Sequence, residues 1–279
     1  MNLHKYNLCY FFQILIVVFT VSGCSSSTPA IEESSTTYSI ASGEIDRNYF
    51  FAGQPVSVSY PNPIEILYNA GYVSGYDETR GTPAWVAYRV FRVVEYHTYP
   101  RLERFLVDSR TNNRISHDVY THSGYDRGHM APNFAIVTRY GQEAQRETFL
   151  MTNIIPQTPQ LNRQWWAGLE RLIAWDYSEA FDEVWVITGP VFQEKGNWIQ
   201  EAIKIPSHHF KILKVEVEGE LWMKAFLVPQ LIEGNEDLEP YLVSVHEIEE
   251  LTGLNFNPGL DPATACILES QRLLELWNH

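Results

Sequence analysis

An arginine and a histidine two residues apart are the first side chains with an evident chemical use. They belong to the segment Asp126-Arg127-Gly128-His129. In an extended strand this spacing places both side chains on the same face. Histidine titrates near neutral pH and can act as a general base, whereas arginine stays charged and binds phosphate oxygens. The pair therefore suggests attack on a phosphate ester, although an ordinary surface strand could carry the same two residues.

A second set of candidates lies on a helix that the pattern of large apolar residues predicts over residues 160–180. Asn162 falls in its first turn, and Glu170 follows eight residues later, about two turns on and roughly 80° round the axis. Both can lean toward one cleft. An amide oxygen and a carboxylate are hard oxygen ligands that suit Mg²⁺. The alternative is that Asn162 caps the helix and Glu170 lies on a solvated face.

The elements that must position these residues predict an α+β fold. Strands and helices are mixed without a regular βαβ alternation, which favours a mostly antiparallel central sheet with flanking helices. Clusters of β-branched and aromatic residues predict strands at 84–94, 148–153 and 183–188, and a hairpin at 210–218 and 221–228. Helices are expected at 160–180, 246–253 and 263–277.

Composition limits how the chain can meet a partner. The sequence has 34 acidic and 20 basic residues, giving a formal charge of −14, so any binding of nucleic acid must come from a local site. A zinc site would need ligands such as His97, His122, His208 and His209, but their spacings match no short zinc motif. Three tryptophans are assigned to core and rim packing rather than to stacking on bases. They are Trp165, Trp166 and Trp175.

The first residues are typical of an export signal. Residues 1–23 contain an apolar stretch at 8–21, too short for the roughly 20 residues of a membrane-spanning helix, and end before Cys24. The sequence Val21-Ser22-Gly23-Cys24 predicts a lipoprotein signal peptide with lipidation at Cys24. Residues 24–43 are predicted to form a Ser/Thr-rich tether, and 44–279 a single domain. We therefore expect a protein exported and lipid-anchored to a bacterial membrane, with the outer membrane favoured.

Taken in order, the motifs resemble the DNA/RNA non-specific endonuclease family, whose members include endonuclease G and share a ββα-metal active-site motif. Besides the Asp126-Arg127-Gly128-His129 segment, the resemblance is carried by Pro83-Ala84-Trp85-Val86-Ala87-Tyr88, Thr148-Phe149-Leu150-Met151-Thr152-Asn153, Thr188-Gly189-Pro190, Lys211, Ala225-Phe226-Leu227 and the segment from Val243 to Gly253.

This resemblance implies a role for each candidate. His129 matches the general base, Arg127 the arginine that stabilises charge on the phosphate, Asn162 the direct Mg²⁺ ligand and Glu170 the carboxylate that holds metal-bound water. A further arginine upstream is expected at the scissile phosphate. We assign it to Arg104, with Arg101 as the other candidate because the local spacing fits neither cleanly.

The implied function is a Mg²⁺-dependent, sugar-non-specific endonuclease, with Mn²⁺ as an alternative ion. It would hydrolyse DNA and RNA and leave 5′-phosphate ends. Some relatives pair, so a homodimer is also expected as an option. Two rival interpretations stay open: a phosphodiesterase restricted to small nucleotides, and a non-catalytic lipoprotein that binds nucleic acid.

Overall fold

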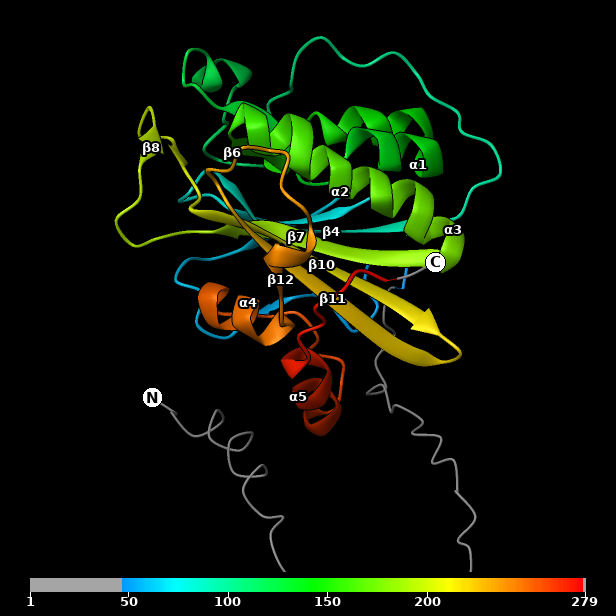
Figure 1. The fold of residues 1–279 in the computed structure, drawn as a ribbon. Coiled ribbons are helices and arrows are strands. Elements are labelled where there is room, and N and C mark those ends of the chain that lie inside the picture. Colours follow the sequence, from blue (N-terminus) through cyan, green and yellow to red (C-terminus); the bar gives the residue numbers. More distant parts are fainter. Residues whose placement is uncertain (1–46, 278–279) are drawn as a thin grey trace, which may run out of the picture. The chain divides into compact units, whose positions relative to one another are not determined.

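A seven-stranded antiparallel sheet organises the protein, which we describe from a computed structural model over residues 47–277 (Figure 1). All neighbouring strands in it are antiparallel. In spatial order the strands are β12 (Leu242–Val243), β11 (Glu220–Pro229), β10 (His208–Val217), β7 (Glu183–Val191), β4 (Thr82–Phe91), β3 (Val73–Asp77) and β2 (Glu65–Tyr68). The expected α+β class with an antiparallel sheet is confirmed.

Both faces of this sheet are covered, which explains the long apolar runs of its central strands. In β7, Val184 and Val186 pack into one hydrophobic cluster, while Trp185 and Ile187 pack into a second cluster on the opposite face. Successive side chains of a strand point to opposite faces, so a strand buried on both sides is apolar at almost every position.

Helices cover the two faces in separate layers (Figure 1). On one face lie α1 (Asn133–Thr148) and a helical run formed by η4 (Leu161–Trp166), α2 (Ala167–Leu172), η5 (Ile173–Tyr177) and α3 (Ser178–Ala180). On the other face lie α4 (Val245–Thr252) and α5 (Pro262–Ser270). The ends of α4 follow the sequence closely, because Ser244 and Glu247 form a reciprocal capping box and Gly253 ends the helix at φ 73°.

Short elements complete the described chain. They are the strand pairs β1 (Val56–Ser57) with β13 (Leu254–Asn255), β5 (Asp126–His129) with β6 (Ile154–Gln157) and β8 (Trp198–Ile199) with β9 (Ile203–Lys204), and the 3₁₀ turns η2 (His117–Tyr120), η3 (Met151–Asn153) and η6 (Glu239–Tyr241).

Most predicted elements are present, but two boundaries are wrong. The expected strand at 148–153 is instead the end of α1 and the turn η3, and the strand β6 begins only at Ile154. The helix expected to reach residue 277 ends at Ser270, because Gln271 adopts an extended conformation with φ −70° and ψ 124°. Helix α1 was not expected from the sequence, and it contains Gly141 in a non-helical conformation with φ 86°.

The expectations for the first residues lie outside the described part of the chain. The signal peptide at 1–23, the lipidation site Cys24 and the tether at 24–43 all precede residue 47. Within residues 47–277, no helix is both long enough and apolar enough to cross a membrane. The boundaries proposed for the domain, 44–279, stay a prediction.

Candidate active site

Two short strands and the helical run that follows them form the framework of the site. Strand β5 pairs antiparallel with β6, and the helical run starts just after β6. The side chain of Gln157 lies directly against the backbone at position 128, which is glycine: a Cβ there would collide with it. This arrangement has the order strand, strand, helix that a ββα motif requires, with α1 inserted between the strands.

Asn153 fixes the chain just after His129. Its side-chain Oδ1 accepts a hydrogen bond from the Ala131 backbone N–H at 2.8 Å. Its Nδ2 donates to the carbonyl oxygens of Ala131 and Thr148, both at 3.0 Å. Asn153 is fully buried, and each of these bonds satisfies a buried polar group, so the loss of its amide would leave several groups unpaired. The position of His129 therefore depends on this asparagine.

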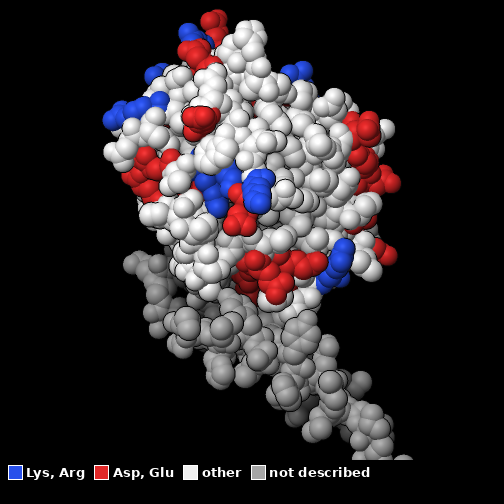
Figure 2. Space-filling model, turned by 90° about the vertical axis from the view of Figure 1, so that its left-hand side faces the viewer, with Lys and Arg blue, Asp and Glu red and all other residues white. Residues whose placement is uncertain are grey.

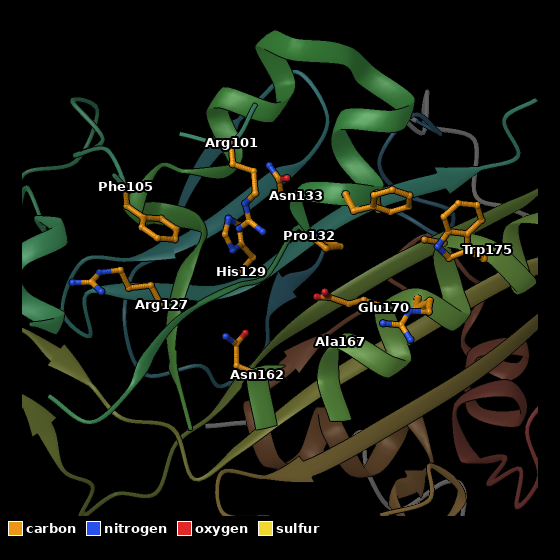
Figure 3. Close-up of a pocket in the computed structure, with 14 residues that line it drawn as sticks. Arg101, Phe105, Arg127, His129, Pro132, Asn133, Asn162, Ala167, Glu170 and Trp175 are labelled. Atoms are coloured by element: carbon orange, nitrogen blue, oxygen red, sulfur yellow. The ribbon is translucent and has the colours of Figure 1, made fainter. Parts of the chain in front are cut away.

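The predicted site residues lie around one cleft of about 440 Å³ (Figure 3). Its lining includes Arg127, His129, Asn162 and Glu170. The imidazole of His129 and the side chains of Asn162 and Glu170 border the same open space in the figure. The fold therefore brings these candidates together in one cleft, from β5 and from the helical run.

His129 is held as a neutral base by its surroundings. Its ring packs against the rings of Phe105 and Phe149, with centroid distances of 5.2 and 5.4 Å. Burial and, to a smaller extent, the nearby positive charge of Arg101 together lower the pKa of His129 to about 3. Nε2 has no hydrogen-bond partner among residues 47–277. The imidazole is therefore unprotonated at neutral pH and free to accept a proton.

Asn162 is oriented by Asp126. The Asn162 Nδ2 donates to Asp126 Oδ2 at 2.9 Å, so the amide nitrogen is occupied and the oxygen is left for a ligand. Arg163 donates two further hydrogen bonds to the same carboxylate, both at 2.7 Å. The hydrogen bonds from these two residues help to hold the pKa of Asp126 below its usual range. Asp126 therefore acts as a positioning residue for Asn162.

Glu170 faces a buried lysine from the central sheet. Its Oε1 lies 4.0 Å from Nζ of Lys211, which is completely buried on β10. Burial raises the pKa of Glu170, and the positive charge of Lys211 opposes that rise. Lys211 also donates to the hydroxyl of Tyr88 at 3.1 Å and lies 4.5 Å from the centre of the Trp166 ring. Lys211 thus stabilises the ionised form of Glu170, a function that the sequence analysis did not assign to it.

Three arginines differ in how they relate to the cleft. Arg127 lines it, but its guanidinium points away from His129, and its Nε and Nη2 donate to the His117 carbonyl at 3.1 and 2.7 Å (Figure 3). Arg101 lines the cleft and points toward His129. Arg104 does not line it: this exposed side chain pairs with Asp118 at 2.8 Å. Of the two candidates for the upstream arginine, the geometry therefore favours Arg101 over Arg104.

The donors at this site fit a hydrated divalent ion. Glu170 Oε1 accepts no hydrogen bond from residues 47–277 although it is shielded from solvent, and the Asn162 oxygen is left open by Asp126. Within the same part of the chain, no cluster of three or more His, Cys, Asp and Glu side chains could hold a metal. One amide and one carboxylate suit Mg²⁺, which keeps several waters and needs few protein ligands.

The charge of the cleft is opposite to that of the whole chain. Arg101, Arg127 and Arg171 line it, against the single carboxylate of Glu170. The face in Figure 2 carries acidic and basic groups side by side and no continuous basic surface. A local positive potential can attract a polyanion despite a net charge of −14.

Comparisons with known proteins show the family of this chain. The model of the DNA/RNA non-specific endonuclease family matches residues 53–263. The chain belongs to this family. It is 31% identical to mitochondrial nuclease EXOG of Xenopus laevis over 72% of the chain and 62% of that protein. It is 28% identical to a nuclease of Nostoc sp. over 95% of the chain and 98% of that protein.

A solved structure shares the fold. The crystal structure of the EndoG/EndoGI complex contains a chain that matches with a TM-score of 0.63 and 24% identity, over 72% of this chain and 89% of that one. The chain spans about three-fifths of the length of the mitochondrial nucleases it matches. Similarity to the solved structure supports the α+β architecture around the cleft.

One residue that the sequence analysis assigned to packing belongs to the cleft. Trp165 and Trp166 are buried, as predicted, but Trp175 is 41% exposed and lines the cleft. With regular α-helical spacing, Trp175 would lie about 140° round the axis from Glu170. Trp175 lies in the π-helical turn η5, whose wider winding changes the direction of its side chain from that expected for a regular α-helix. No apolar periodicity predicts such a turn.

The buried histidines predict how stability depends on pH. Burial lowers the pKa of both His129 and His209 to about 3, whereas in the unfolded chain each titrates near 6.5. Between these values the unfolded chain binds more protons, so each histidine contributes stability above pH 6.5 that is lost as the pH falls. We expect His209→Gln to flatten the decline in unfolding free energy by about 1 kcal/mol per pH unit.

Urea unfolding between about pH 7 and 4 would measure this change. His97→Gln serves as the control, because the His97 side chain is 76% exposed. A His209→Gln variant whose pH dependence is parallel to that of the wild type would contradict the assignment of a buried, neutral imidazole.

Proposed function

We propose that this protein is a metal-dependent, sugar-non-specific endonuclease that hydrolyses phosphodiester bonds of DNA and RNA. The main observation behind this proposal is that three groups share one cleft: a neutral imidazole, an amide oxygen left open for a ligand, and a carboxylate whose Oε1 accepts no hydrogen bond from the described residues. They belong to His129, Asn162 and Glu170. Family membership supports the reaction class, and the arginines of the cleft provide charge for the phosphate groups of the substrate.

In the proposed mechanism His129 starts the reaction. Its neutral imidazole takes a proton from a water molecule as that water attacks phosphorus, in line with the departing O3′. Arg101 binds a nonbridging phosphate oxygen, where negative charge increases during the attack. The product would carry a 5′-phosphate, as the resemblance to the family implies. Arg127 binds the neighbouring part of the strand, because its guanidinium lies at the edge of the cleft away from His129.

Asn162 and Glu170 would hold the divalent ion, Asn162 directly and Glu170 through water. When bound, Mg²⁺ or Mn²⁺ supplies positive charge that stabilises the phosphate in the transition state. The chain prepares for this ion in two ways: Asp126 holds the amide nitrogen of Asn162, and the positive charge of Lys211 favours the ionised form of Glu170 against the effect of burial.

We expect His129→Ala to lower the cleavage rate by a factor on the order of 10² to 10⁴ while substrate binding is largely kept, because the base is removed and the arginines stay. Digestion of plasmid DNA and of RNA with Mg²⁺, with Mn²⁺ and with chelator measures this. If the wild type cleaves only small phosphodiesters, the phosphodiesterase interpretation is favoured. If the wild type cleaves no substrate, the non-catalytic interpretation is favoured. Wild-type rates in the variant would refute the role of His129.

The two upstream arginines give a second prediction. Arg101→Ala should lower kcat/KM for plasmid DNA by at least about tenfold, because it removes a positive charge beside the reacting phosphate. Arg104→Ala is the matched control and should change kcat/KM less than about twofold, since an exposed ion pair contributes little. A larger loss of kcat/KM in Arg104→Ala than in Arg101→Ala would show that Arg104 is the arginine at the scissile phosphate.

Export and lipidation stay predictions from the sequence alone. The apolar stretch at 8–21 and the residues Val21-Ser22-Gly23-Cys24 support an exported protein anchored to a bacterial membrane through Cys24. Labelling of the full chain with a radioactive fatty acid should succeed, and Cys24→Ser should abolish it. Equal labelling of both chains would overturn the prediction.

A further inference from the structure

An exposed aromatic surface forms one end of the cleft. Trp175 is 41% exposed and lines the cleft (Figure 3). Phe134, from the start of α1, also lines it. Neither residue is needed for the chemistry proposed above. Trp175 is no more exposed than Trp222, but unlike Trp222 it lines the cleft, where a bound substrate strand can reach it.

Neighbouring rings hold Trp175 in place. The Trp175 ring lies 4.2 Å from the centre of the Tyr96 ring and 5.3 Å from that of Phe134, the latter at an interplanar angle of 24°. Tyr96 in turn lies under the guanidinium of Arg139, at 5.7 Å. Arg139 is tied to the helical run by a hydrogen bond of 2.6 Å to the Ala174 carbonyl. The exposed indole is therefore supported from both α1 and the segment that follows β4.

A positively charged side chain without a partner accompanies these rings. Arg171 is exposed, lines the cleft and makes no hydrogen bond or ion pair with any residue in the range 47–277. Arginine binds phosphate through several donors. Proteins that bind single-stranded nucleic acid combine aromatic side chains, on which bases stack, with positively charged side chains, which bind the phosphates. The rings and the guanidinium of Arg171 provide both.

We propose that Trp175, supported by Phe134 and Tyr96, stacks on a base of the substrate strand near the scissile phosphate, while Arg171 binds the adjoining phosphate. This inference rests on the proposed function and adds to it a substrate preference. A base can stack on Trp175 only when it has left its neighbours in a duplex, so the site favours single-stranded or locally opened DNA and RNA.

Binding is the direct test, and it can be made without cleavage. In a chain that carries His129→Ala, the affinity for a labelled single-stranded oligonucleotide is measured by fluorescence anisotropy with Mg²⁺ present. Adding Trp175→Ala should weaken binding by roughly tenfold, because one stacked base is lost. An oligomer of equal length made of abasic deoxyribose phosphates should bind both chains equally, since it offers no base to stack.

Two variants separate stacking from other effects. Trp175→Phe keeps an aromatic ring and should stay within about threefold of the parent chain. Trp222→Ala removes an equally exposed tryptophan, 43% accessible, from β11 outside the cleft, and should leave both affinities unchanged. Thermal unfolding of each variant shows whether the fold is kept.

Several results would overturn the inference. Trp175→Ala with unchanged affinity would exclude a contact with the strand, and an equal loss for the normal and the abasic oligomer would show a structural role only. Failure of the wild type to cleave DNA or RNA would refute the proposed function. It would leave the stacking inference to be decided by the binding comparison, which does not depend on catalysis.

Discussion

An unprotonated imidazole beside positive charge is the condition on which the rest of this site depends. A base that already carries a proton cannot take another, and binding a polyanion tends to raise the pKa of any histidine nearby. The protein opposes that tendency by packing His129 between Phe105 and Phe149 and by directing Arg101 toward it. The guanidinium that attracts the phosphate thus also keeps the base free. Arg101 therefore affects both the binding of the substrate and the pKa of His129.

Glu170, the carboxylate of the site, must keep its charge, and a buried residue of the core favours the charged form. Glu170 is largely buried, which favours its protonated form, whereas binding metal-bound water requires the ionised form. Lys211, from the centre of the sheet, supplies the compensating charge at 4.0 Å. A buried charge pair of this kind costs desolvation energy, and replacing either partner would leave the other uncompensated. The central sheet therefore contributes an electrostatic element to the cleft as well as mechanical support.

The sequence predicted what depends on local spacing and missed what depends on irregular structure. Alternating and apolar patterns identified β4, β7 and the β10–β11 hairpin, and the pairs Arg127/His129 and Asn162/Glu170 marked residues that do meet in one cleft. Arg101 and Arg104 could not be ranked, because they lie in a segment without a regular period. Trp175 was assigned to packing, since the α-helical repeat does not anticipate the π turn at Ile173–Tyr177. The turn at Met151–Asn153 resembled a strand in composition and is instead shaped by the buried amide of Asn153.

Because α1 is inserted between β5 and β6, the cleft can form only late in folding. The two strands that position His129 are separated in the chain by a 16-residue helix and the turn after it, so their pairing closes a long loop and has an entropic cost. Glu170 needs a further contact with β10, more distant still in the chain. A newly made or partly folded polypeptide accordingly has the residues of a nuclease without their arrangement, and hydrolytic capacity arises only with completed tertiary structure.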